Sequence, residues 1–252
     1  MTNQGYGADD DAGTGTLWFT PVTDKEKGRR HALTRERVVA EALTIISAEG
    51  VEAVSMRALA ALLGVVPGAL YRHVRSKEQL HDLVLDGVLA EVDCQVDHSQ
   101  PWTEQVTVLA QRLRLVLEDH PGIAGLLKTR DPLSPHSLAL AEAFLAPLHA
   151  AGLPEHQTAL AYRLIYDYTL GFALSDRTSA GEQRVQDAVT RREMQAFLRS
   201  LPVDRFPMVA ALGEHVWVTD RDERFTANLH TLINGLRAAP RPRHSRTRQA
   251  RR

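Results

Sequence analysis

Basic and hydrogen-bonding side chains gather in one short stretch of the chain, between residues 55 and 77. The side chains of Arg72 and His73 can donate hydrogen bonds to phosphate oxygens or to base edges. Arg72 is our candidate for a base contact, because a guanidinium group binds guanine bidentately. We expect Tyr71 and His73 to contact phosphates, and Arg57 and Lys77 to hold the flanking backbone. The predicted DNA-contacting set is Thr34, Ser55, Arg57, Pro67, Gly68, Ala69, Tyr71, Arg72, His73 and Lys77.

These side chains must be positioned by secondary structure. The pattern of residues 55–73 predicts two short helices joined by a tight turn. Apolar residues recur at helical spacing in the first helix: Met56, Leu59, Ala60, Leu62 and Leu63. Gly64 tolerates a left-handed backbone and would end this helix. Pro67 can begin the next one, because the first residue of a helix needs no amide donor. The small Gly68 and Ala69 would let this second helix come close to a partner surface, while Leu70 is expected in the core.

A longer helix is predicted on each side of this pair. Upstream, residues 33–50 form an amphipathic pattern with Thr34 as N-cap and Gly50 as the C-terminal stop, and their buried stripe is Val38, Ala42, Ile45 and Ile46. Ser55 is placed to cap the first short helix. Downstream, Ser76 and Gln79 predict a capping box for a helix that begins near Lys77 and continues to about Val96. This order is typical of a helix-turn-helix whose second helix enters the major groove of DNA.

The chain resembles the TetR/AcrR family of bacterial transcriptional regulators. The resemblance is carried by Ala42-Leu43, Glu49-Gly50 and residues 55–60, 63–65, 70–74 and 76–80. A more diffuse resemblance to the C-terminal domain of the tetracycline-repressor branch covers most of residues 101–237, through Trp102, His120-Pro121, Gly125, Tyr168 to Gly171 and Phe225 to Leu236. The resemblance implies a ligand-responsive regulator, usually a repressor, that binds a palindromic operator on double-stranded DNA as a homodimer.

The predicted fold is all-α, because no run of alternating β-branched residues bounded by hairpin turns is present. We expect a disordered leader at 1–32, a three-helix DNA-binding domain at 33–80, a larger helical effector-binding and dimerisation domain at 81–238, and a basic disordered tail at 239–252. In the larger domain, helices are expected at 102–120, 123–129, 137–151, 154–174, 189–200, 204–213 and 220–238, with a loop at 175–188.

The charge distribution fits DNA binding. The net charge is −1, but it divides into −4 over residues 1–24, +4 over 25–81, −7 over 82–240 and +6 over 241–252. Phosphate attraction supplies much of the affinity of DNA-binding proteins. The basic run at 28–31 either reaches DNA as an arm or forms a solvated leader. The Arg-rich tail either adds non-specific attraction to DNA or stays solvated.

Several other classes are disfavoured. Cys94 is the only cysteine, which excludes an internal disulfide and a Cys-rich metal site. No secretory signal and no apolar run long enough to span a bilayer is visible, so we expect a cytoplasmic protein without membrane contact. Phosphate-binding glycine loops, the nucleophile-elbow motif and His-Glu-x-x-His are absent. We therefore predict no enzyme activity, cofactor or metal, although a helical enzyme stays a distant alternative.

A regulator also needs a site for its signal. Apolar and tyrosine side chains of the larger domain either line a pocket for an apolar or aromatic effector or pack the core: Val88, Val92, Leu109, Leu113, Leu127, Tyr162, Tyr166 and Tyr168. Where the tetracycline-repressor resemblance would bring a drug-contacting and a magnesium-binding histidine, this chain has Asp93 and Leu127, which argues against tetracycline–magnesium. An effector-blind DNA-binding protein, with no such pocket, is the alternative.

Two helices, at 154–174 and 220–238, carry more apolar surface than one buried face requires. In the tetracycline-repressor branch the matching pair forms a four-helix bundle with its symmetry mate, which implies a homodimer with Leu232 and Ile233 in the bundle. The alternative is that both helices are ordinary core of a single protomer. The helix that begins at Lys77 would join the DNA-binding domain directly to the effector pocket through Leu83, Leu85, Val88 and Val92.

Overall fold

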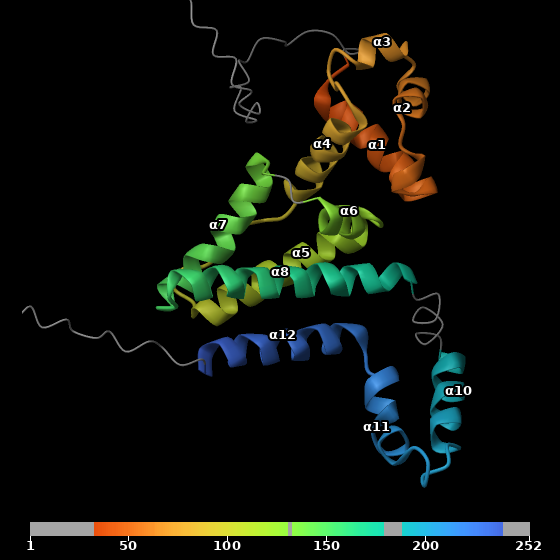
Figure 1. Ribbon diagram of the computed structural model, residues 1–252, viewed down its shortest axis with the longest axis vertical. Coiled ribbons are helices and arrows are strands. Elements are labelled where there is room, and N and C mark those ends of the chain that lie inside the picture. The colour runs from red at the N-terminus through yellow and green to blue at the C-terminus, as the bar shows by residue number, and fades with distance from the viewer. Residues whose placement is uncertain (1–32, 131–132, 179–187, 239–252) are drawn as a thin grey trace, which may run out of the picture. The chain divides into compact units, whose positions relative to one another are not determined.

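The computed structural model describes residues 33–130, 133–178 and 188–238, and every regular element in these ranges is helical (Figure 1). The all-α fold is thus confirmed. The predicted leader and tail, and residues 179–187 of the predicted loop, lie outside the described residues. None of the described helices is both long enough and apolar enough to cross a membrane.

The DNA-binding domain has the predicted order of helices. They are α1 (Arg35–Glu49), a short 3-10 turn (Val51–Ala53), α2 (Met56–Leu63), α3 (Pro67–Leu70) and α4 (Lys77–Leu89). Thr34 Oγ1 accepts the amide of Arg37 at 3.2 Å, and Ser55 Oγ accepts that of Ala58 at 3.1 Å. Gly64 ends α2 with φ of 68° in the left-handed region. The two hydroxyls satisfy amides that have no partner within a helix, while the amide of Gly64 donates to the carbonyls of Ala60 and Ala61 at the end of α2.

The core of this domain is also the predicted one, with a single exception. Its buried residues include Val38, Ala42, Ile45, Ile46, Leu59, Leu63 and Leu70. Leu62 was expected on the buried face of α2, but this residue is 47% exposed. The buried face of this eight-residue helix is already formed by four residues, Met56, Leu59, Ala60 and Leu63. Leu62 lies at the edge of that face and remains in contact with solvent.

The helix that begins at Lys77 is shorter than predicted, because α4 ends at Leu89 and not near Val96. Asp93 explains part of the difference: its Oδ1 accepts the amide of Gln95 at 2.9 Å, and such local bonds compete with helix formation. Arg112 then donates to the backbone carbonyl of Asp93 at 2.8 Å. At the start of α4, Ser76 Oγ accepts the amide of Gln79, but Gln79 accepts from Arg75 and not from Ser76, so only half of the predicted capping box forms.

The larger domain contains α5 (Trp102–Asp119), α6 (Ile123–Thr129), α7 (Pro135–Ala150), α8 (Glu155–Thr178), α10 (Ala188–Arg199), α11 (Pro207–Trp217) and α12 (Arg221–Ala238). The long α8 packs against α5, α6, α7 and α12. The boundaries of α5, α6 and α12 agree with the predicted helices within one residue. By contrast, α8 continues through residue 178, into the expected loop, and α11 begins and ends later than expected.

The start of α7 is set by two serines. Ser134 Oγ accepts the amide of Ser137, and Ser137 Oγ accepts the amide of Ser134 at 2.9 Å. This reciprocal pair satisfies two amides at the helix end and starts α7 two residues before the predicted position. A hydroxyl that can both donate and accept replaces the usual Glu or Gln, which the motif search did not anticipate.

Candidate nucleic-acid interface and small-molecule pocket

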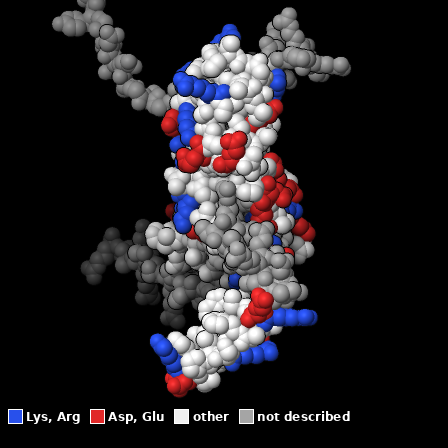
Figure 2. Space-filling model, turned by 90° about the vertical axis from the view of Figure 1, so that its right-hand side faces the viewer, with Lys and Arg blue, Asp and Glu red and all other residues white. Residues whose placement is uncertain are grey.

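The predicted DNA-contacting residues divide into exposed side chains and supporting ones. Arg57 is exposed on α2, Tyr71 and Arg72 are exposed in the turn that directly follows α3, and His73 in the same turn is half-buried. Leu70 is fully buried, as predicted, and holds α3 against the core. Figure 2 shows Lys and Arg side chains at the end of the protein that carries α1–α3. Part of the positive charge predicted for residues 25–81 comes from residues 25–30, which lie outside the described ranges.

Of the remaining predicted contacts, Pro67 and Gly68 are exposed on α3 and Ala69 is half-buried, while Thr34, Ser55 and Lys77 also have partners within the domain. Thr34 and Ser55 use their side-chain oxygens as caps, which leaves each hydroxyl hydrogen able to donate to a phosphate. Lys77 Nζ lies 3.8 Å from Oε2 of Glu52, whose side chain is almost fully exposed. Such a surface ion pair contributes only about 0–1 kcal/mol, so it does not compete strongly with a phosphate for the lysine.

Two apolar residues of this surface were missed by the sequence analysis. Val66 is the N-cap residue of α3 and is 70% exposed, while Leu62 near the end of α2 is 47% exposed. Exposed apolar side chains at a recognition helix can contact the methyl group of thymine. Hydrophobic periodicity could not have found them, because it assigns every apolar residue at helical spacing to the core.

The helix α4 leads from this surface into the larger domain, where two of its carboxylates bind the end of α6 and the start of α7. Asp82 Oδ1 accepts from Arg130 Nη2 at 2.7 Å and from Arg130 Nε at 3.0 Å. One turn later, Asp86 accepts the backbone amide of His136 at 3.0 Å, and its other oxygen lies 3.1 Å from His136 Nδ1. Asp86 therefore caps the start of α7 from another helix. We call these four residues the α4 latch.

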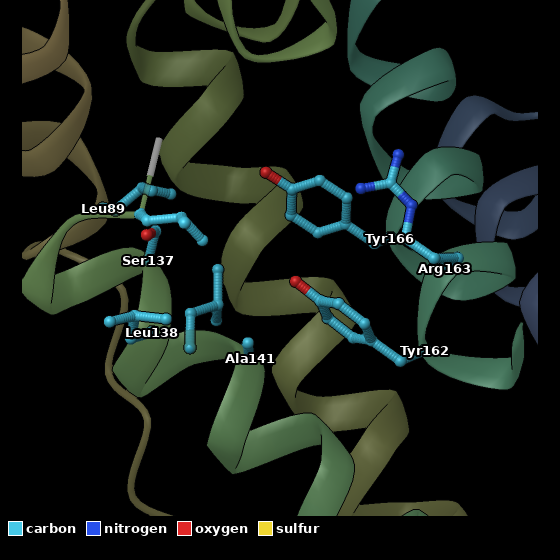
Figure 3. Close-up of a pocket in the computed structure, with 9 residues that line it drawn as sticks. Leu89, Ser137, Leu138, Ala141, Tyr162, Arg163 and Tyr166 are labelled. Carbon is cyan, nitrogen blue, oxygen red and sulfur yellow. The ribbon is translucent and has the colours of Figure 1, made fainter. Parts of the chain in front are cut away.

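A pocket of about 150 Å³ lies directly beside this latch, between α4, α7 and α8 (Figure 3). Tyr162 and Tyr166, two of the residues predicted for an effector site, are among its lining residues. Their ring centres are 5.6 Å apart, and the guanidinium carbon of Arg163 lies 5.5 Å from the Tyr166 ring centre. The other lining residues were not anticipated: Leu89, Leu133, Ser137, Leu138, Leu140, Ala141 and Arg163. Periodicity places α7 in the core and does not show which of its residues face a cavity.

The other predicted pocket residues do not line this cavity. Val88, Val92, Leu109, Leu113 and Leu127 are all buried in the hydrophobic core. Tyr168 donates from its hydroxyl to the carbonyl of Phe225 at 3.0 Å and stacks on the Phe225 ring. Burial raises the pKa of Tyr168, which favours this neutral, donating form.

Comparison with known proteins finds a family match for the helix-turn-helix region and another for the larger helical domain. Residues 38–84 match the family described as "Bacterial regulatory proteins, tetR family", and residues 97–239 match "Tetracyclin repressor-like, C-terminal domain". The chain belongs to the TetR family. It is therefore a DNA-binding transcriptional regulator, and the resemblance seen in the sequence is confirmed.

Its relatives among TetR regulators include well-covered matches. A transcriptional regulator of Saccharopolyspora erythraea is 32% identical over 211 residues, which cover 83% of this chain and 86% of the relative. The transcriptional repressor DrrR1 of Streptomyces coeruleorubidus is 29% identical over 235 residues, or 91% of this chain and 87% of the relative. The structure of apo ActR from Streptomyces coelicolor has a TM-score of 0.72 and 33% identity, covering 82% of this chain and 95% of that one. ActR has also been solved with (S)-DNPA and with actinorhodin.

In this TetR regulator the two positions compared with tetracycline-repressor histidines have structural roles. Asp93 lies 3.1 Å from Arg112 in an ion pair, and Leu127 is buried in the core. Neither side chain lines the pocket beside α4.

The two helices predicted to form a dimer present different surfaces. On α8, Leu160 and Leu164 are 56% and 43% exposed and lie one turn apart. On α12, Leu232 is half-buried, but Ile233 packs in the core of the protomer with Phe225 and Leu229. The expectation that Ile233 belongs to an exposed bundle face has to be revised, because its side chain is already covered within one chain.

Proposed function

We propose that this regulator is a repressor, which binds a palindromic operator as a homodimer and is released by a small molecule bound between α4, α7 and α8. The observation that carries the proposal is the course of α4. This single helix starts at Lys77, beside the recognition motif, and ends at Leu89 in the wall of the pocket. The naming of DrrR1 as a repressor and the ligand-bound structures of ActR support it.

The α4 latch supplies a route from pocket to DNA. His136 precedes the pocket residues Ser137 and Leu138 on α7, so a ligand that moves the start of α7 also acts on Asp86 of α4. A movement of α4 changes the separation of the two recognition helices of a dimer, and the two half-sites then fit poorly. For release, the ligand must prefer the DNA-incompetent state, since equal affinity for both states shifts nothing.

Exposed apolar surface supports the homodimer. Leu160 and Leu164 form an apolar stripe on α8, which packs beside α12 in the same protomer. Pairing these two helices with their symmetry mates would bury that stripe in an isologous four-helix interface. A palindromic operator then follows from the two-fold symmetry of the protein.

One observation, the small volume of the pocket, favours the effector-blind alternative. The pocket volume of about 150 Å³ is smaller than the range of about 300–1,000 Å³ usual for ligand sites. Against this alternative, Leu133 and Leu138 at the same pocket are 64% and 41% exposed, which leaves apolar surface for a ligand to cover.

The test is operator affinity under matched conditions. A palindromic site is first selected from a randomised duplex library, and its affinity is measured by fluorescence anisotropy with and without candidate effectors at a fixed salt concentration. We expect at least one pocket ligand to weaken operator binding by about tenfold, which corresponds to about 1.4 kcal/mol of coupling. Asp86→Ala should reduce this factor while Glu104→Ala, an exposed acidic control on α5, should not. Ligand that occupies the pocket with constant operator affinity would favour the effector-blind alternative.

A further inference from the structure

The start of the recognition helix carries an exposed apolar residue where a polar one is usual. Val66 is the N-cap residue of α3, and among the described residues no large apolar residue is more exposed, at 70%. It gives the helix no side-chain cap, whereas Ser, Thr, Asp or Asn in this position could accept a backbone amide. Val66 therefore adds less to the stability of its own helix than a polar residue would. Such a departure from a local rule is expected where a residue serves a function.

The position of Val66 makes this residue part of the DNA-binding surface. In this DNA-binding family α3 is the second helix of the helix-turn-helix, and the N-terminal residues of that helix contact base edges in the major groove. The residues that follow leave Val66 accessible. Pro67 and Gly68 are exposed, and a Cβ atom added to Gly68 would meet no heavy atom of the described chain within 4 Å. The apolar surface of Val66 is thus continuous with the surface that meets the bases.

The chemistry of a valine side chain selects one feature of the major groove. Valine neither donates nor accepts a hydrogen bond, so it cannot bind the donors and acceptors that distinguish most base pairs. The groove also displays one apolar group, the 5-methyl group of thymine. Branching at Cβ leaves Val66 few rotamers, so its methyl groups are held in place before DNA binds. Burying these methyl groups against a thymine methyl is therefore the favourable base contact open to this side chain.

We propose that Val66 determines part of the operator sequence, because its side chain packs against the 5-methyl group of one thymine in each half-site. The inference deepens the proposed binding of a palindromic operator and rests on it. The contact differs in kind from the one expected of Arg72, which recognises guanine through hydrogen bonds. Each half-site should therefore contain one thymine whose methyl group, and not its hydrogen-bonding edge, contributes to the affinity.

The test removes single methyl groups from the DNA. Each thymine of the selected operator is replaced by uracil in both half-sites, one position at a time, and the affinity of the full-length protein is measured by fluorescence anisotropy without effector. Uracil keeps the hydrogen-bonding groups of thymine, so only the methyl contact is lost. We expect one position to weaken binding by about fourfold per half-site, or about fifteenfold for both. A scan without an effect at any position would overturn the proposal.

Variants show which residue makes the methyl contact. Val66→Ala removes the two methyl groups of the side chain, so the ratio of thymine to uracil affinity at the sensitive position should fall towards one. Leu62→Ala is the matched control, because Leu62 is also exposed and apolar but lies on α2, the helix that crosses the DNA backbone. Its ratio should equal that of the unaltered protein. A ratio that persists in Val66→Ala, or disappears in Leu62→Ala, would assign the contact to another residue and overturn the proposal.

Two further variants separate recognition from folding. Val66→Ser can cap α3 with its hydroxyl, so it should unfold at a higher urea concentration than the unaltered protein. Because it carries no methyl group, its ratio of thymine to uracil affinity should nevertheless fall as in Val66→Ala. Val66→Thr keeps one methyl group and should give an intermediate ratio. A purely structural residue would not lose thymine recognition while the protein gains stability, and an undiminished ratio in Val66→Ser would contradict the proposal.

A methylated cytosine tests the same contact in a different base pair. Replacing the sensitive T·A pair by C·G should weaken binding, and 5-methylcytosine in that position should restore about fourfold per half-site. Val66→Ala should bind the two cytosine operators equally. Tight binding of the selected operator without any dependence on these methyl groups would leave operator recognition standing and refute the role of Val66. Failure to select any operator would refute both.

Discussion

A Cβ atom added to Gly87 of α4 would lie 2.7 Å from Cγ1 of Val39 on α1. The helices α1 and α4 therefore approach closely at this point, and only a residue without a side chain allows this approach. The β-branched Val39 has few alternative rotamers, so it cannot easily move aside.

Gly87→Ala should therefore destabilise the protein by about 1–3 kcal/mol, because the added methyl overpacks the α1–α4 contact. Urea unfolding measures the change. The double variant Gly87→Ala with Val39→Ala should recover part of the loss. Gly235→Ala in α12, where an added Cβ meets nothing within 4 Å, is the control and should be neutral or slightly stabilising. Equal effects at both glycines would show that the close approach has no energetic consequence.

Arg72→Ala should weaken operator binding by about 1–3 kcal/mol and relax the base preference at one position of each half-site, since a bidentate guanine contact is lost. Affinities for the selected operator and its single-base variants measure both effects. Arg192→Ala, an exposed arginine of α10, provides the comparison. A uniform loss over all sequences would make Arg72 a phosphate contact.

Leu164→Glu should yield monomers and abolish tight operator binding, because the substitution buries an unpaired charge in the proposed interface. The side chain is exposed in the protomer, so folding should be retained. Sedimentation velocity reports the oligomeric state. Leu115→Glu, at a similarly exposed leucine of α5, should remain dimeric. Ile233→Glu is unsuitable for this test, since it would disrupt the core itself. A monomeric unaltered protein at micromolar concentration would refute the dimer.

His81 should make the protein less stable in mild acid. Burial, and then Lys77 and Arg130, lower the pKa of this side chain below the ordinary value of 6.5. The unfolded chain therefore binds the proton more readily than the folded one, so stability falls as the pH drops below about 6.5 towards the pKa of the folded state. Unfolding free energies at pH 5.5 and 7.5 measure this. His81→Gln should reduce the difference, while exposed His230→Gln should leave it as it is. An undiminished difference in His81→Gln would assign the acid sensitivity to other groups.

The sequence alone determined the elements whose signals are local. Thr34, Ser55, Gly64 and Pro67 act through their own backbone and the next few residues, so the helix-turn-helix, its caps and the start of α3 were predictable before any tertiary contact was known. The end of α3 was not, because the recognition helix was expected to run from Pro67 to His73 and ends at Leu70. The family followed from the same stretch. The end of α4 was not predictable in this way, because the apolar pattern continues past Leu89 while an Asx turn at Asp93 and the side chain of Arg112 hold the next segment out of the helix.

Only the tertiary structure decided which apolar residues face a cavity, a core or solvent. Leu62 and Leu63 are adjacent in sequence, yet one is exposed and the other buried, because burial depends on the neighbouring helices. For the same reason Leu113 packs in the core while Leu138 lines the pocket. The α4 latch joins Asp82 to Arg130 and Asp86 to His136 across about fifty residues, and no local periodicity relates such positions.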